Sequence, residues 1–177
     1  MAFVILGLLH LRAMSMYDLV KAFDQGISLF YSASTGSIKR ALDGLLAKGH
    51  IAIDEIQPGA RGRKTYAITE AGRSAFQTWM HAPLTETDIE AAALPRLYLL
   101  GLLPAAERPA ILSAMRERVA RDLATLENLA TAVDATPVAP ELADVAHFGR
   151  ATLDYGITSH RAGLEWFSAL LDSEGTG

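Results

Sequence analysis

Two strand-like segments flanking a loop of proline, glycine and arginine most constrain the fold of this chain. Residues 50–57 read HIAIDEIQ, in which Ile51 and Ile53 alternate as in a half-buried strand, and the second segment reads KTYAIT. The loop between them, PGARGR, carries the residue types of hairpin turns. The sequence therefore predicts a β-hairpin whose tip presents Arg61 and Arg63, with Lys64 beside them.

Helical patterns surround this hairpin. An almost uniformly apolar segment, AFVILGLLHL, predicts a buried first helix, and an amphipathic second helix follows Ser15, a typical N-cap residue. The third helix, in STGSIKRALDGLLAKGH, ends at Gly49 as at a C-cap, and Thr69 precedes a fourth helix. The order helix, helix, helix, strand, basic loop, strand, helix is that of a winged helix-turn-helix, in which the hairpin is the wing.

The third helix has a polar face suited to a nucleic-acid groove. Its apolar stripe is Ile38, Leu42, Leu45 and Leu46, and at 100° per residue the opposite face holds Gly36, Ser37, Arg40, Asp43 and Ala47, flanked by Lys39. Such a helix enters the major groove N-terminus first, while a basic wing contacts phosphates or the minor groove. The alternative is that RGRK is only a solvated turn. The residues expected to contact DNA are Ser34, Thr35, Ser37, Lys39, Arg40, Arg61, Arg63 and Lys64.

Charge divides the chain into two halves of opposite sign. Residues 1–81 carry nine Lys and Arg against six Asp and Glu, whereas residues 82–177 carry seven against fourteen. A polyanion is therefore expected to bind the N-terminal half. We expect a winged helix-turn-helix domain over residues 1–81 and a helical dimerisation domain over residues 82–177, in a mainly α fold with one small β-hairpin.

The C-terminal half reads as three long helices. The second carries an apolar stripe of Leu112, Met115, Val119, Leu126, Leu129 and Val133. The third begins near Pro140, and its stripe is predicted to form a dimer interface, because the small winged domain offers little apolar surface to cover it. A self-contained helical hairpin is the alternative. The predicted interface residues are Leu153, Ile157, Leu164, Phe167 and Leu171.

Several classes of function are not supported by the sequence. The chain has no cysteine, which excludes disulfides and thiolate chemistry and favours a reducing compartment, the cytoplasm. No Walker, GxGxxG, HExxH or GxSxG motif occurs, so neither an enzyme nor a cofactor is expected. Asp144 and His147 have a spacing that can hold a metal, but a helical pair of this kind is usually structural, and we expect no metal. No apolar run is long enough for a membrane helix.

Four segments within residues 3–75 follow a known pattern: ILGLL, SMYDLVKAF, TGSIKRALDGLLAKGHI and, most specifically, GRKTYAITEAGR. With them, most of residues 3–75 resembles the PadR-like transcriptional regulators. Met16 stands where the family usually has glycine, and Lys39 where it usually has tyrosine. The resemblance implies that Tyr17, the start of the third helix and the wing face DNA, and that the C-terminal helices form a dimer.

The sequence and the resemblance together predict a dimeric, sequence-specific repressor that a small aromatic effector releases from DNA. The aromatic residues expected nearest an effector pocket are Trp79, Tyr98, His160 and Trp166. The alternative is a winged protein-interaction module that no longer binds operator DNA.

Overall fold

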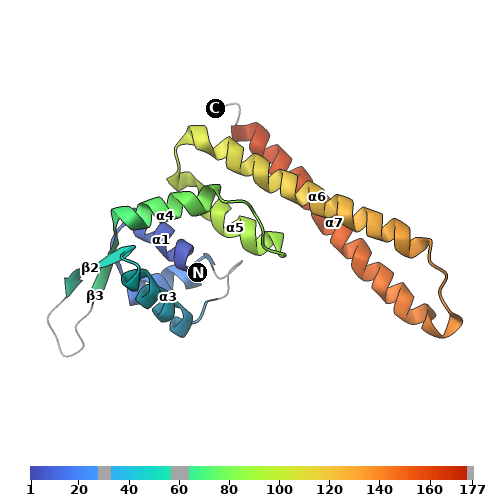
Figure 1. Ribbon diagram of the computed structural model, residues 1–177, viewed down its shortest axis with the longest axis horizontal. Helices are drawn as coiled ribbons and strands as arrows, with labels where there is room; N and C mark the ends of the chain where they lie inside the picture. Colours follow the sequence, from blue (N-terminus) through green and yellow to red (C-terminus); the bar gives the residue numbers. More distant parts are fainter. Residues whose placement is uncertain (28–32, 57–63, 175–177) are drawn as a thin grey trace. The chain divides into compact units, whose positions relative to one another are not determined.

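The computed structural model describes residues 1–27, 33–56 and 64–174. The chain divides into two compact units, Met1–Ala105 and Ala106–Gly177 (Figure 1). The elements of the first unit are α1 (Ala2–Leu11), β1 (Met14–Ser15), α2 (Met16–Asp24), α3 (Thr35–Ala47), β2 (Ile51–Ile56), β3 (Lys64–Ile68), α4 (Glu70–His81), α5 (Ile89–Leu99) and the 3-10 turn η2 (Leu100–Leu102). Those that follow are the turn η3 (Ala105–Glu107), α6 (Arg108–Asp134), the turn η4 (Pro140–Leu142) and α7 (Ala143–Glu174).

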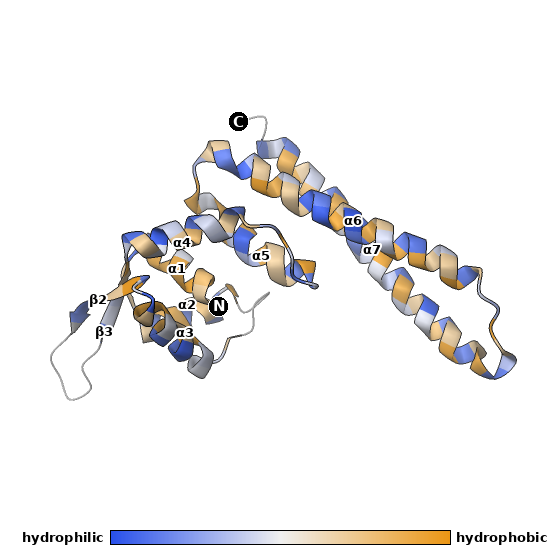
Figure 2. Cartoon of the chain, viewed as in Figure 1, coloured by the Kyte–Doolittle hydropathy of each residue, from blue (hydrophilic) through white to orange (hydrophobic). Residues whose placement is uncertain are grey.

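Helix α1 forms the centre of the first unit. It is apolar along nearly its whole length (Figure 2), and Val4, Ile5, Leu6, Leu8 and Leu9 are all buried. Helices α3, α4 and α5 and strand β3 all pack against it. The prediction of a buried first helix is confirmed, and α1 thereby becomes the surface on which the other elements are positioned.

Side-chain caps determine where helices α2, α3 and α4 begin. Ser15 and Asp18 form a capping box before α2, with the Ser15 backbone N–H donating to the carboxylate at 2.9 Å. Ser34 caps α3 and Thr69 caps α4 through side-chain oxygens that accept backbone N–H groups. Gly49 follows α3 with φ of 67°, the left-handed conformation that ends a helix. These starts and this end agree with the sequence predictions.

The sheet has three strands, not only the predicted hairpin. Its order is β1-β3-β2, with both pairings antiparallel and a register shift in β2 between Ile53 and Glu55. Met14 pairs with Tyr66, so the segment between α1 and α2 supplies a short third strand. Two residues are too few to show an alternating pattern, and the sequence therefore contained no signal for β1.

The first unit extends beyond the boundary expected after His81. Helix α5 approaches α1 so closely that a Cβ on Gly7 would lie 2.5 Å from a methyl carbon of Leu99. Arg96 of α5 also donates to the carbonyl of Ala82 at 3.1 Å. Helix α5 runs through Pro95 without a break and ends at Leu99. The compact unit therefore includes α5 and ends at Ala105.

The second unit is an antiparallel pair of long helices, α6 and α7, that lie side by side (Figure 1). Leu123 and Ala130 of α6 form a buried cluster with Ile157 of α7, and partly buried leucines of both helices pack around it. Within the described residues, no helix is both long and apolar enough to cross a membrane.

Candidate nucleic-acid interface

Helix α3 begins with a reciprocal pair of serines. The Ser37 hydroxyl donates to the Ser34 carbonyl at 2.7 Å and accepts from the Ser34 backbone N–H at 2.9 Å. Ser34 in return accepts the Ser37 backbone N–H through its side chain at 3.1 Å. The Ser37 hydroxyl thus makes both of these hydrogen bonds within the first turn of the helix, while Thr35 and Gly36 beside it are exposed.

The exposed face of α3 carries two cations near this first turn. Arg40 folds back along the helix, so that its guanidinium nitrogen lies 3.8 Å from the position of a Cβ on Gly36. A Cβ at that distance would make only an ordinary van der Waals contact with the guanidinium, which lies over the N-terminal end of the helix. Lys39 pairs with Asp43 one turn later, with 2.9 Å between ammonium nitrogen and carboxylate oxygen. The opposite face is anchored by buried Ile38, Leu42 and Leu45, which confirms the predicted amphipathic orientation.

The remaining residues predicted to contact DNA lie outside α3. Tyr17 is 70% exposed in the first turn of α2, two residues after the capping serine. Lys64 is exposed and is the first residue of β3, where its backbone pairs with Ile56. The wing loop, with Arg61 and Arg63, lies outside the described residues.

The end of α3 is joined tightly to the start of α4. The Thr69 backbone N–H donates to the carbonyl of His50 at 3.0 Å, and the Thr69 hydroxyl donates to the carbonyl of Gly49 at 2.6 Å. A Cβ on Gly72 would lie 2.0 Å from the His50 oxygen, so only glycine allows this approach. Because β3 runs directly into Thr69, this junction links the position of the hairpin strands to that of α3.

The predicted effector residues of the first unit are Trp79 and Tyr98. The Trp79 ring stacks on Phe3 with centroids 5.1 Å apart, and the guanidinium of Arg96 lies 5.2 Å from its centroid. Tyr98 is 51% exposed, and its hydroxyl lies 3.7 Å from the position of a Cβ on Gly26. Trp79 therefore already has an aromatic ring and a cation against its indole, whereas Tyr98 has an exposed ring.

Arg96 is a buried cation that the sequence analysis did not select. It is 2% exposed, and its Nε–H has no hydrogen-bond partner among the described residues. Burial lowers the pKa of its guanidinium, and the negative charge of Glu86 opposes that shift. The sequence signal was one arginine within the apolar run LPRLYLL, which we interpreted only as part of a helix.

The second unit contains His160 and Trp166, the other two predicted effector residues. His160 is half-buried, with its ring Nδ1 2.8 Å from the carbonyl oxygen of Gly156 in the preceding turn. Trp166 is 52% exposed and meets Phe167 edge to face, with 5.2 Å between ring centroids. These two aromatic side chains leave α7 in different directions, one along its own helix and the other toward solvent.

Most of the side chains predicted to form the dimer interface pack within one chain, between α6 and α7. Leu153 and Leu164 pack around Ile157 in the cluster with α6, Phe167 is buried and Leu171 is half-buried. A different apolar row remains uncovered on α7. It comprises Val145, Phe148, Tyr155 and Trp166, all exposed, and we call it the outer stripe.

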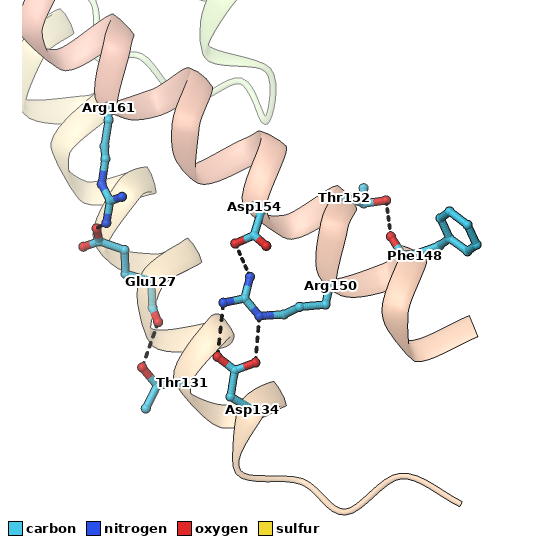
Figure 3. A network of polar contacts seen from close by, with 8 residues as sticks. All are labelled: Glu127, Thr131, Asp134, Phe148, Arg150, Thr152, Asp154 and Arg161. Carbon is cyan, nitrogen blue, oxygen red and sulfur yellow. Dashed lines mark hydrogen bonds and ion pairs between the residues drawn. The ribbon is translucent and has the colours of Figure 1, made fainter. Parts of the chain in front are cut away.

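One flank of the second unit is held by ion pairs (Figure 3). Arg150 of α7 donates to both carboxylate oxygens of Asp134 of α6, at 2.7 and 3.1 Å, and also pairs with Asp154. Arg161 pairs with Glu127 at 2.5 Å. The hydrogen bond from Arg150 is the main reason that the pKa of Asp134 is lowered. These groups line an open groove of about 330 Å³, in which each carboxylate is already paired with an arginine.

Metal ligands do not gather anywhere in the parts of the chain that the structure describes. No three histidine or acidic side chains there lie close enough together to hold an ion. Asp144 and His147, the pair with metal-compatible spacing, are therefore not joined by a third ligand from those parts of the chain.

Comparison with known proteins connects the first unit to a family of regulators. Residues 5–78 match the transcriptional regulator PadR-like family. The probable transcriptional regulator Rv1176c of Mycobacterium tuberculosis is 32% identical over 77 residues, which are 43% of this chain and 41% of that protein. The negative transcriptional regulator PadR of Bacillus subtilis is 31% identical over 88 residues, 48% of either chain. The matched segment thus spans somewhat less than half the length of these relatives.

A solved structure resembles the chain over nearly its full length. The crystal structure of Bacillus subtilis PadR in complex with operator DNA covers 98% of this chain and 98% of its own, with a TM-score of 0.45 and 22% sequence identity.

Proposed function

Because the chain carries a domain of the transcriptional regulator PadR-like family over residues 5–78, we propose that it binds double-stranded DNA at specific sites and represses transcription. The observation that carries this proposal is the exposed face of α3 within that domain, where Lys39 and Arg40 project beside a capped N-terminus. A winged helix-turn-helix inserts this end into the major groove, where arginine pairs with guanine more often than any other contact. We assign DNA binding to residues 1–81 and place the dimerisation helices within residues 82–177, of which α5 packs on the first unit, in a cytoplasmic protein.

Electrostatics support the N-terminal half as the DNA-binding part. Cations outnumber acids by three there, although the whole chain has a net charge of −4. Phosphate contacts supply most of the sequence-independent affinity for DNA, and they weaken with added salt. Arg61 and Arg63 of the wing and Lys64 are proposed to make such contacts, together with Tyr17 and Lys39.

The test is a binding titration on the DNA immediately upstream of the coding region, followed by fluorescence anisotropy at several salt concentrations. Arg40→Ala is expected to reduce discrimination between this DNA and a scrambled duplex by roughly 5- to 150-fold, the value of one good base contact. Lys39→Ala is expected to weaken binding to both duplexes and to reduce the salt slope by about one. Arg116→Ala removes the same charge from an exposed site on α6 and is the matched control.

A wild-type protein that binds neither duplex would refute the proposal and favour the alternative, a winged module that binds another protein. That alternative is also compatible with the acidic C-terminal half, whose fourteen acids face only seven cations.

Dimerisation is proposed through the outer stripe of α7. At 100° per residue its four side chains fall within about 80° of one another, away from Ile157 and the α6 contact. A row of exposed aromatic and aliphatic side chains of this kind is typical of a protein interface. Phe148→Glu combined with Tyr155→Glu is expected to shift the protein to monomer in sedimentation velocity, whereas Thr158→Glu, exposed but off the stripe, is not.

Release from DNA by a small aromatic effector completes the proposal. Tyr98 and Trp166 support it, because each exposes half of an aromatic side chain to which a planar ligand can bind. The Trp79 ring is stacked on Phe3, and the His160 ring contacts the Gly156 carbonyl, so a ligand has to displace these groups to reach either ring. Titration of tryptophan fluorescence with phenolic acids, with and without DNA, tests this step. A binding constant that DNA does not change would argue against release.

A further inference from the structure

The exposed face of α3 carries a carboxylate that DNA binding alone does not explain. Asp43 lies one turn beyond Lys39 and on the same face as Arg40, and its side chain is 61% exposed. A carboxylate on a surface that approaches phosphates is repelled by them, so it lowers affinity for DNA in general. Such a group favours one DNA site over others if it makes a contact that other DNA sequences cannot provide.

The surroundings of Asp43 allow it to approach base edges. Its neighbours on the same face are Gly36, Gly44 and Ala47, and a Cβ on Gly44 would meet nothing within 4 Å. Arg40 and Asp43 are therefore the polar side chains that project furthest from the centre of this face, with Lys39 at its edge. They are three residues apart, so they lie about 4.5 Å apart along the helix axis.

We propose that Asp43 is a specificity-determining residue that accepts a hydrogen bond from the N4 amino group of a cytosine in the major groove. This inference rests on the proposed function, because it requires α3 to enter that groove. Arg40 donates to guanine at a neighbouring base pair. The two side chains together select adjacent positions with a guanine for the donor and a cytosine for the acceptor.

The chemistry of the base edges distinguishes cytosine from the other three bases. An ionised carboxylate only accepts hydrogen bonds. Guanine presents two acceptors in the major groove and thymine presents one acceptor and a methyl group, so neither offers a donor to Asp43. Adenine has an amino group, but its N7 acceptor lies next to it and repels a carboxylate, whereas cytosine presents the amino donor alone.

Lys39 has a second role in this arrangement. In the free protein its ammonium group pairs with Asp43, at 2.9 Å, and both side chains are more than half exposed. Exposed pairs of this kind contribute little stability, so the pair is easily opened. When α3 enters the groove, Lys39 moves to a phosphate and leaves the carboxylate of Asp43 for the base.

The experiment selects preferred duplexes from a random library with the full-length wild-type chain and then repeats the selection with Asp43→Asn and Asp43→Ala. Asparagine both donates and accepts, which matches adenine, so Asp43→Asn is expected to replace the selected cytosine by adenine at one position of each half-site. Asp43→Ala is expected to accept any base there, and its discrimination at that position falls by about 5- to 150-fold. Glu70→Gln, the same loss of charge at an exposed site on α4, should keep the wild-type preference.

Three different outcomes would overturn the inference. If the wild type selects a defined site and both Asp43 variants select the same site, Asp43 does not read a base, and the proposed function stands. If the variants bind all duplexes more tightly by the same factor, Asp43 acts only through general repulsion of phosphates. A wild-type protein that selects no site refutes the proposed function, and the inference fails with it. Circular dichroism of each variant checks that it keeps the helical content of the wild type.

Discussion

Replacement of Gly72 by alanine is expected to loosen the junction that joins α3 to α4. The new Cβ would lie 2.0 Å from the His50 carbonyl oxygen and 2.9 Å from Cγ1 of Ile68, well inside any ordinary contact. The first turn of α4 therefore has to move by about 1 Å or more, given contact distances of roughly 3.5 Å between such atoms. That shift strains the hydrogen bonds from Thr69 to the carbonyls of Gly49 and His50.

The size of the effect follows from these contacts. Two hydrogen bonds contribute about 0.5–1.5 kcal/mol each, and overpacking costs roughly 1–3 kcal/mol. Alanine in place of glycine within a helix returns about 1 kcal/mol. The expected net loss in the free energy of unfolding is about 3 kcal/mol, which for a chain of this size lowers Tm by roughly 6–12 °C.

The measurement is thermal and urea unfolding followed by circular dichroism. The first unit is also followed by the fluorescence of Trp79 in a Trp166→Phe background. Gly44→Ala is the matched control, because it is the same substitution within a helix but a Cβ there meets nothing within 4 Å. The control should gain up to about 1 kcal/mol from helix propensity. Equal stability of the Gly72 and Gly44 variants would show that the His50 carbonyl oxygen does not lie against Gly72.

Three further predictions follow from other contacts. Ser15→Ala removes half of the capping box with Asp18 and should lower the free energy of unfolding by about 1 kcal/mol in urea titrations, unlike Ser15→Thr, which keeps a hydroxyl that can accept from the Asp18 backbone N–H and donate to its carboxylate. Arg150 lowers the pKa of Asp134 in the folded state, so this ion pair stabilises the fold at pH values above the ordinary aspartate pKa near 4. The contribution is lost as the pH falls through the lowered pKa of the folded state, and Asp134→Asn should remove this acid dependence from thermal unfolding. Arg96→Met should be nearly neutral in urea unfolding, since it keeps the buried volume and removes a poorly satisfied charge, whereas Arg96→Ala should lose about 2–4 kcal/mol.

Much of the first unit could be predicted because its signals are local. A cap residue acts on backbone N–H groups two or three residues away, so Ser15 and Thr69 could be identified as helix starts from the sequence alone. Helical periodicity determined which face of α3 is buried, and therefore placed Lys39, Arg40 and Asp43 on the exposed side. The wing arginines and their role remain predictions from composition and spacing.

Features that depend on partners distant in sequence were decided only by the tertiary structure. Strand β1 exists because Met14 meets Tyr66 across more than fifty intervening residues, and a pair of residues has no periodicity of its own. Periodicity identified the apolar stripe of α7 but not what covers it, and packing against α6 left the outer stripe as the free surface. Arg96 is likewise a buried cation only because α5 packs against α1. Local hydrogen bonds and the helical repeat are encoded within a few residues, whereas the choice of neighbour depends on the shape and apolar surface of the whole folded chain.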